Sequence, residues 1–348
     1  MLVAATLLTA LMGCGETPEI AAGDLPGEAH DITGDDDLGG PEFFVANRSG
    51  RAVATYESAT GKRLDEIVAP KGLEIDQISS VARGGFIFSA TDERRIPHFF
   101  RAGLASDGSV SLVKPLTLPY GFTPATIAMA MSWSGSKLAY FGGFGGDGSA
   151  GARLTVRDLS KSRVYEFPLA RKTSSWISEI SWASDEKHLV MTVLSPCGNA
   201  PPDGAACTGD VSVRVLDSTS TGLDINDAPE IARHPAWGTA TQNGLASYVS
   251  GSAVLGPDGS AAYVPLSRTE KDGHRSTLVQ EISSPSGELI RELALRPTVK
   301  DSILSLAMDE SGRYLIARFP GSLERIRLSD GAHVTTVLND GGISQVAW

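Results

Sequence analysis

The chain has 348 residues, of which 41% are hydrophobic and 20% are charged; this composition excludes a disordered tail or a collagen and indicates a globular protein. The formal net charge of −11 argues against nucleic acid as a partner, because phosphate binding needs a basic face. With 38 Gly, 19 Pro and only 3 Cys, the chain is rich in turns and depends on a packed core rather than on a framework of disulfides.

An uninterrupted run of apolar and small residues occupies positions 2–12. At about 1.5 Å per residue this run is too short to cross a hydrocarbon layer of about 30 Å, so it is typical of a signal peptide. The residues Leu11-Met12-Gly13-Cys14 that follow resemble the lipobox of bacterial lipoproteins, whose cysteine is lipidated and becomes the mature N-terminus. We therefore predict a signal peptide over residues 1–14 and lipidation of Cys14; the alternative is an ordinary cleaved signal and a secreted product.

Residues 15–41 contain eight acidic residues and no Lys or Arg. Such a segment cannot bury enough apolar surface to fold. We expect it to be a disordered tether that holds the following domain about 30 Å from a membrane.

From residue 42 onward, short β-type runs rich in Val, Ile, Tyr and Phe alternate with turns of Gly, Ser, Asp and Pro. One unit recurs: an apolar strand, a tight turn and a second apolar strand. It is clearest at 177–191 and 303–317, with looser copies at 78–88, 129–140 and 254–264. A third and a fourth strand follow most copies, and four antiparallel strands per unit are typical of a β-propeller blade.

The two ends of this region complete each other. Residues 43–46, 52–58 and 64–68 match the second to fourth strands of a blade, and residues 343–348 match a first strand without a blade. Full units start near residues 76, 126, 177, 250 and 302. The sequence therefore predicts an all-β, six-bladed propeller over residues 42–348, closed by pairing of the N- and C-terminal strands, which removes free sheet edges.

The segments 132–140 (SWSGSKLAY) and 181–185 (SWASD) are similar to the repeat of the TolB-like and WD40-like (PD40-type) propellers of bacterial envelopes, especially uncharacterised actinobacterial ones. The resemblance implies a propeller exposed in the cell envelope. It is less informative about function, because propellers serve binding, scaffolding and several kinds of chemistry.

Cys197 and Cys207 enclose nine residues within one predicted hairpin. In an exported protein this pair is expected to form a disulfide, which contributes on the order of 3 kcal/mol. A zinc site is not predicted, because no second Cys or His pair lies at ligand spacing.

Four polar residues are candidates to line the central channel. Glu179 and Gln345 occupy the same place in their first strands as Ser80 and Ser305. Polar packing between blades is the alternative. The six histidines are dispersed over the chain, and a propeller can gather a few around its axis, so a metal-dependent lactonase or hydrolase stays open.

Five tryptophans divide into two groups. Trp133, Trp182 and Trp348 end first strands at matching positions, so we expect them to pack between blades. A second group, formed by Trp176, His234 and Trp237, is a candidate exposed contact for a partner; packing under the connection that contains Trp237 is the alternative.

The sequence favours a non-enzymatic, membrane-anchored envelope lipoprotein that binds a protein, peptide or glycan through loops at one end of its channel. We expect a monomer without a cofactor. The alternative is a propeller hydrolase or lyase, lactonase-like or esterase-like, with a metal or carboxylates on the axis. Three or more Asp, Glu, His or Asn side chains within about 3 Å of one point in the channel would favour that alternative.

Overall fold

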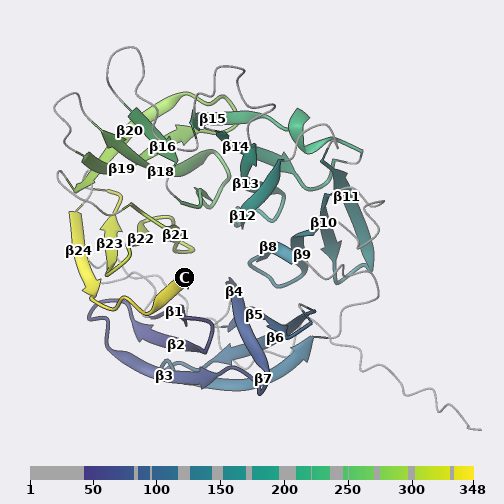
Figure 1. Ribbon diagram of the computed structural model, residues 1–348, viewed down its shortest axis with the longest axis vertical. Helices are drawn as coiled ribbons and strands as arrows, with labels where there is room; N and C mark the ends of the chain where they lie inside the picture. The colour runs from purple at the N-terminus through teal and green to yellow at the C-terminus, as the bar shows by residue number, and fades with distance from the viewer. Residues whose placement is uncertain are drawn as a thin grey trace, which may run out of the picture.

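A computed structural model describes residues 43–81, 85–94, 96–116, 126–142, 152–169, 175–195, 209–220, 222–235, 246–249, 251–269, 275–296, 302–329 and 333–348. These residues form six antiparallel sheets, which stand around a common axis as the blades of a propeller (Figure 1). The predicted all-β, six-bladed propeller is therefore confirmed. None of the helices in these ranges is long and apolar enough to span a membrane.

In each blade the first strand lies nearest the axis and the fourth lies outermost (Figure 1). Blade A consists of β25 (Ile343–Ala347), β1 (Phe43–Arg48), β2 (Ala52–Glu57) and β3 (Arg63–Val68). Blade B consists of β4 (Leu73–Val81), β5 (Gly85–Asp92), β6 (Pro97–Leu104) and β7 (Val110–Leu116). Blade C consists of β8 (Thr126–Met131), β9 (Lys137–Gly142), β10 (Arg153–Asp158) and β11 (Arg163–Pro168).

The other three blades repeat this order. Blade D consists of β12 (Trp176–Trp182), β13 (His188–Ser195), β14 (Asp210–Asp217) and β15 (Glu230–Pro235), with the 3₁₀ helix η1 (Ile225–Asp227) before β15. Blade E has a divided first strand, β16 (Ala246–Val249) and β17 (Val254–Leu255), followed by β18 (Ala261–Thr269), β19 (Arg275–Ser283) and β20 (Leu289–Arg296). Blade F consists of β21 (Ser305–Met308), β22 (Tyr314–Arg318), β23 (Leu323–Arg327) and β24 (His333–Leu338).

The ring closes in blade A, where β25 pairs with β1 in antiparallel register. Val45 lies opposite Ala347, and Ala46 lies opposite Val346. The closure predicted from the two ends of the sequence is confirmed. It also places the last residue, Trp348, near the axis, where Figure 1 marks the C-terminus.

The hydrophobic core consists of layers between neighbouring blades. One layer joins blades F and A and contains the stacked rings of Phe44 and Tyr56, whose centroids lie 5.2 Å apart. The next layer joins blades A and B around the fully buried Phe86 and Phe88. Strands buried on both faces account for the nearly continuous apolar runs of the second strands.

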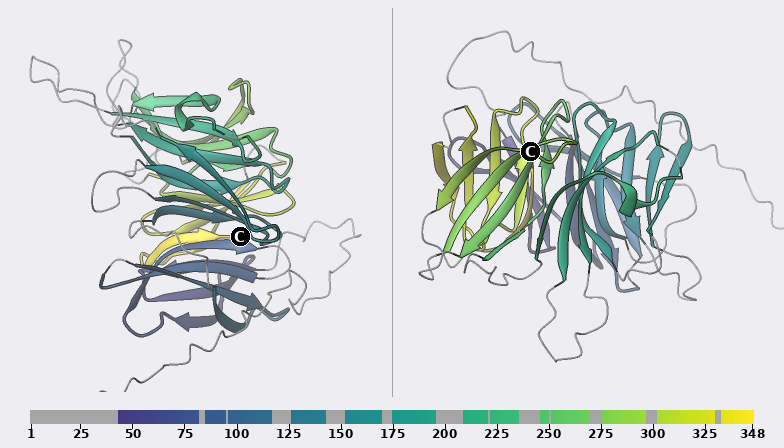
Figure 2. Two further views of the ribbon diagram at one scale, coloured as in Figure 1. Left: turned by 90° about the vertical axis from the view of Figure 1, so that its right-hand side faces the viewer. Right: turned by 90° about the horizontal axis from the view of Figure 1, so that it is seen from above.

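Tight turns connect first and second strands at one face of the ring. Gly135, Gly259 and Gly312 occupy corresponding places in three of these turns, with φ angles of 71°, 72° and 69°. Side chains with a Cβ rarely adopt this conformation, so glycine is favoured there. Figure 2 shows the strands running between the two faces of the ring, with the connections gathered at those faces.

Candidate functional site

The first strands of four blades carry a β-bulge at the same place. The register shifts between Ile75 and Gln77 in β4, between Thr126 and Ala128 in β8, and between Ile177 and Glu179 in β12. In β25 one residue between Ile343 and Gln345 is likewise unpaired. Because a bulge redirects the side chains that follow it, the residues after the bulges form one equivalent set, which consists of Gln77, Ala128, Glu179 and Gln345.

Glu179 lies three residues before Trp182, the last paired residue of β12. The same spacing from Leu255 in blade E and from Met308 in blade F adds Ser252 and Ser305 to this set. The predicted equivalence of Glu179, Ser305 and Gln345 therefore agrees with the strand register. The predicted equivalence of Ser80 is wrong, because Gln77 holds that place in blade B. Ser80 lies three residues further along β4.

Side chains from the first two strands connect each blade to the next. In three blades the side chain after the bulge position accepts a hydrogen bond from a backbone N–H of the next blade: Gln345 from Ile78 at 2.7 Å, Gln77 from Met129 at 2.6 Å and Ser252 from Leu306 at 3.3 Å. The other three boundaries use different atoms. Between blades C and D, Trp182 Nε1 donates to the Ala130 carbonyl at 3.0 Å. Between blades D and E the Ala253 N–H donates to Thr192 Oγ1 at 3.5 Å, and between blades F and A Arg318 Nε donates to the Ile343 carbonyl at 2.7 Å. Every blade boundary therefore carries a polar link close to the axis.

A cavity of about 110 Å³ lies on the axis and is lined by residues of all six blades. Its wall reaches the face of the tight turns, where Trp133, Ser184 and Asp309 contribute to it. Ser80, Glu179, Ser305 and Gln345, the four residues predicted to line the channel, all lie on its wall. The space is sufficient for several water molecules or a small ligand group.

Glu179 is the unusual residue of this cavity. Its side chain is half-buried: one part borders the cavity, and protein surrounds the rest. Burial raises the pKa of its carboxyl from 4.5 to about 7, and attraction to Arg318 opposes this rise only in part. Within the described ranges, no residue donates a hydrogen bond to this carboxyl.

Two further polar atoms at the wall lack hydrogen-bond partners among the described residues. They are Ser305 Oγ and Trp348 Nε1, and both are buried. Asp309, the second carboxyl at the wall, is engaged instead, because it accepts hydrogen bonds from the Tyr314 N–H at 2.7 Å and from the Ser311 hydroxyl. The cavity therefore offers the Glu179 carboxyl to a bound group, while Ser305 Oγ and Trp348 Nε1 are unpartnered atoms buried in residues of its wall.

No group of three or more His, Cys, Asp or Glu side chains placed to hold a metal ion occurs in the described part of the chain. The convergence that would have favoured a metal or carboxylate centre on the axis is therefore not seen there.

The prediction that tryptophans pack between blades is confirmed for Trp182 and Trp348, which are 5% and 7% exposed and belong to layers shared by two blades. It is wrong for Trp133. Trp133 lies in the turn after β8. The residue of blade C that is equivalent to Trp182 is Met131, because Met131 pairs with Leu138 as Trp182 pairs with Leu189. The half-buried Trp133 side chain lines the cavity instead.

Two of the three predicted partner-contact residues, Trp176 in β12 and His234 in β15, lie in blade D. Trp176 is 38% exposed and shares one cross-strand row with His234, through Leu194 and Val211. Three strand spacings separate the two residues by roughly 14 Å, so they are not in contact. Burial and the nearby Arg268 lower the pKa of His234. Trp237 lies outside the described residues, as do Cys14, Cys197 and Cys207.

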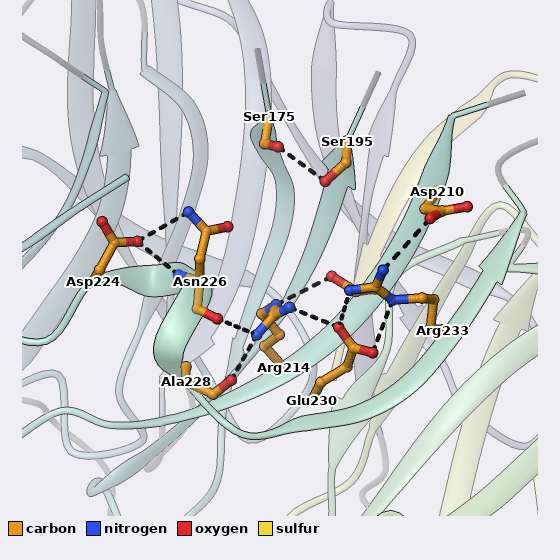
Figure 3. Close-up of polar contacts among 10 residues, drawn as sticks. Ser175, Ser195, Asp210, Arg214, Asp224, Asn226, Ala228, Glu230 and Arg233 are labelled. Carbon is orange, nitrogen blue, oxygen red and sulfur yellow. Dashed lines mark hydrogen bonds and ion pairs between the residues drawn. The ribbon is translucent and has the colours of Figure 1, made fainter. Parts of the chain in front are cut away.

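A polar cluster in blade D, which sequence analysis missed, holds η1 against the sheet (Figure 3). Arg214 donates to the carbonyls of Asn226 and Ala228, both at 2.7 Å, to Glu230 at 2.6 Å and to Ser212 Oγ at 3.2 Å. With its guanidinium bonded in this way and 9% of the residue exposed, Arg214 serves the fold and is not available to a ligand.

No family model matches the sequence, and no curated protein matches it. Solved structures do. A chain of a nidogen/laminin complex has a TM-score of 0.52 at 9% identity, covering 88% of this chain and 97% of that one. The periplasmic gluconolactonase PpgL of Pseudomonas aeruginosa has a TM-score of 0.48 at 12% identity over 87% of this chain and 98% of that one. A functionally unknown protein of Desulfotomaculum acetoxidans has 0.47 at 12% identity, with the same coverages. At such identities the likeness shows the propeller fold alone.

Proposed function

We propose that this chain is a membrane-anchored, extracytoplasmic propeller lipoprotein of the TolB-like type, which acts as a binding module for a protein, peptide or glycan. The observation that carries the proposal is the axial cavity, where the Glu179 carboxyl has no hydrogen-bond donor in the described ranges and where two buried atoms of wall residues, Ser305 Oγ and Trp348 Nε1, are likewise unpartnered. Buried polar groups are normally hydrogen-bonded, so unpartnered groups in a cavity favour a bound ligand.

The binding role is tested by capture of envelope proteins and cell-wall fragments on the immobilised full chain at tens of micromolar. We expect capture by the wild type and loss of capture for a variant with a filled cavity, Ser305→Leu. A matched control, Val164→Leu on the exposed face of blade C, is expected to keep it. No capture by the wild type in either pool would contradict the binding role.

The anchoring proposal is supported by the lipobox ending at Cys14 and by the acidic segment that follows. Two acyl chains give stable membrane attachment where one does not. We expect Cys14→Ala to release the protein from the membrane fraction of the producing cell. An unchanged distribution between membrane and soluble fractions would contradict lipid anchoring through that thiol.

A hydrolase or lyase acting on lactones or esters is the second candidate, and one observation favours it. A carboxyl with a pKa of about 7 in a cavity is suited to general acid–base catalysis near neutral pH. The test is hydrolysis of a panel of lactones and esters by the wild type and by Glu179→Gln. Turnover that the variant lacks supports an enzyme, and equal background rates for both refute it.

A further inference from the structure

The cavity wall is short of a positive charge. The Glu179 carboxyl lies deep in the ring, where an unpaired charge is costly. Arg318, the cation that attracts it, already donates through Nε to the Ile343 carbonyl and forms no ion pair with Glu179. A bound group that brings a positive charge to the cavity removes this cost.

The remaining wall groups indicate which kind of cation fits. Divalent Ca²⁺ and Mg²⁺ need several carboxylate or carbonyl ligands. Of the two carboxyl side chains in the described wall, Asp309 is engaged by its own turn, which leaves Glu179. An ammonium group needs only one carboxylate as its counter-ion, and it is also attracted to aromatic faces. The half-buried Trp133 supplies such a ring at the turn end of the wall, five residues beyond Ala128, the blade C equivalent of Glu179.

The other two tryptophans of the wall already have cations beside them. Lys137 Nζ lies 5.7 Å from the ring centre of Trp182, and the Arg325 guanidinium lies 5.8 Å from that of Trp348. These contacts show that the first-turn end of the ring repeatedly pairs tryptophan with a cation. Among the described residues, no cation lies over the ring of Trp133, the third tryptophan of the wall.

We propose that the axial cavity binds a primary ammonium group, carried by a small amine or by a lysine side chain of a partner, with the Glu179 carboxylate as its counter-ion. The inference rests on the proposed binding function and names the chemistry that the cavity selects. The volume of about 110 Å³ restricts the bound part to a few non-hydrogen atoms.

The test uses calorimetric titration of the full chain with two amines and one neutral control. Ethanolamine represents a small amine, Nα-acetyl-lysine methylamide represents a partner's lysine, and ethylene glycol is the uncharged control. We expect at least one amine to bind wild type at pH 8 with a dissociation constant of about 1 mM, and ethylene glycol to bind far more weakly. The amine that binds identifies the source of the ammonium group.

The variant Glu179→Gln is expected to weaken amine binding at least tenfold and is expected to fold, because glutamine fills the equivalent places in blades A and B. Glu166→Gln, on the outermost strand of blade C, is the matched control and should bind as wild type does. For wild type, affinity should fall about tenfold between pH 8 and pH 6 as the Glu179 carboxyl takes up a proton. Arg318, the charged group that attracts the Glu179 carboxyl, stays charged over this range.

Binding of ethylene glycol as tight as that of the amines, or undiminished amine binding by Glu179→Gln, would overturn the proposal. So would the absence of binding by both amines. If the full chain still captures envelope partners in the assay described above, these results contradict the ammonium site but not the binding role. Failure of the ammonium proposal is therefore distinguishable from failure of the binding proposal.

Discussion

Replacing Glu179 with glutamine tests the physical account of the cavity without any ligand. In blades A and B a glutamine at the equivalent position accepts a hydrogen bond from the next blade. In blade D the corresponding donor, the Ala253 N–H, is instead directed to Thr192 Oγ1 at a long 3.5 Å. A glutamine at position 179 therefore keeps the size of the native side chain, removes its charge and can compete for this N–H.

The magnitude follows from the pKa of Glu179. This pKa rises from 4.5 to about 7 in the folded protein. Because one pKa unit corresponds to about 1.4 kcal/mol, the ionised carboxyl lowers the free energy of unfolding by about 3 kcal/mol above pH 7. The native state binds this proton more tightly than the unfolded state does. The contribution of Glu179 to stability therefore falls as pH rises from about 4.5 to about 7 and is constant at higher pH.

The assay is urea unfolding of the full-length wild type and Glu179→Gln at pH 8 and at pH 4.5. We expect the variant to be more stable by up to about 3 kcal/mol at pH 8 and by less than about 1 kcal/mol at pH 4.5. Other titrating groups affect both proteins alike and cancel in the difference. A difference that does not change with pH, or a variant less stable than wild type at pH 8, would refute the reasoning.

Three further predictions concern the fold. Arg214→Met should lower the free energy of unfolding by about 3–5 kcal/mol, because it removes the ion pair with Glu230 and leaves the carbonyls of Asn226 and Ala228 without their donor. Arg233→Met, at an exposed ion pair, should change it by less than about 1 kcal/mol, and equal effects in urea unfolding would contradict this. Phe88→Ala should cost about 3–5 kcal/mol through a cavity between blades A and B, and a loss below about 1 kcal/mol would show that this layer is not packed as described. Deleting residues 343–348 should expose the edge of β1 and cause self-association in sedimentation experiments, whereas a stable monomer would argue against closure through β25.

The sequence was sufficient to predict the blades, their number and the closure, because each depends on periodic apolar runs and on turn residues. All four residues predicted to line the channel lie on the cavity wall, and the predicted equivalence of Glu179, Ser305 and Gln345 agrees with the structure because their distance from the next turn is regular. Ser80 was assigned to the wrong equivalent position because β4 has nine residues and β12 has seven, so counting from the apolar residues of the two segments does not align them.

Trp133 was misplaced for a related reason. The letters Ser-Trp occur at both 132–133 and 181–182, but the strand register places these two pairs two residues apart. The isolation of the Glu179 carboxyl was also beyond prediction, because it depends on where the Ala253 N–H points and on the lack of an ion pair with Arg318. Such facts depend on packing between blades rather than on any local pattern.

The most direct measurement for the cavity is the titration of the Glu179 carboxyl itself, followed by NMR of ¹³C-labelled glutamate in the full chain and assigned with Glu179→Gln. We expect a pKa of about 7 that moves downward when ethanolamine is added. A pKa near the ordinary 4.5 that ethanolamine leaves unchanged would contradict both the isolation of this carboxyl and its proposed role as a counter-ion.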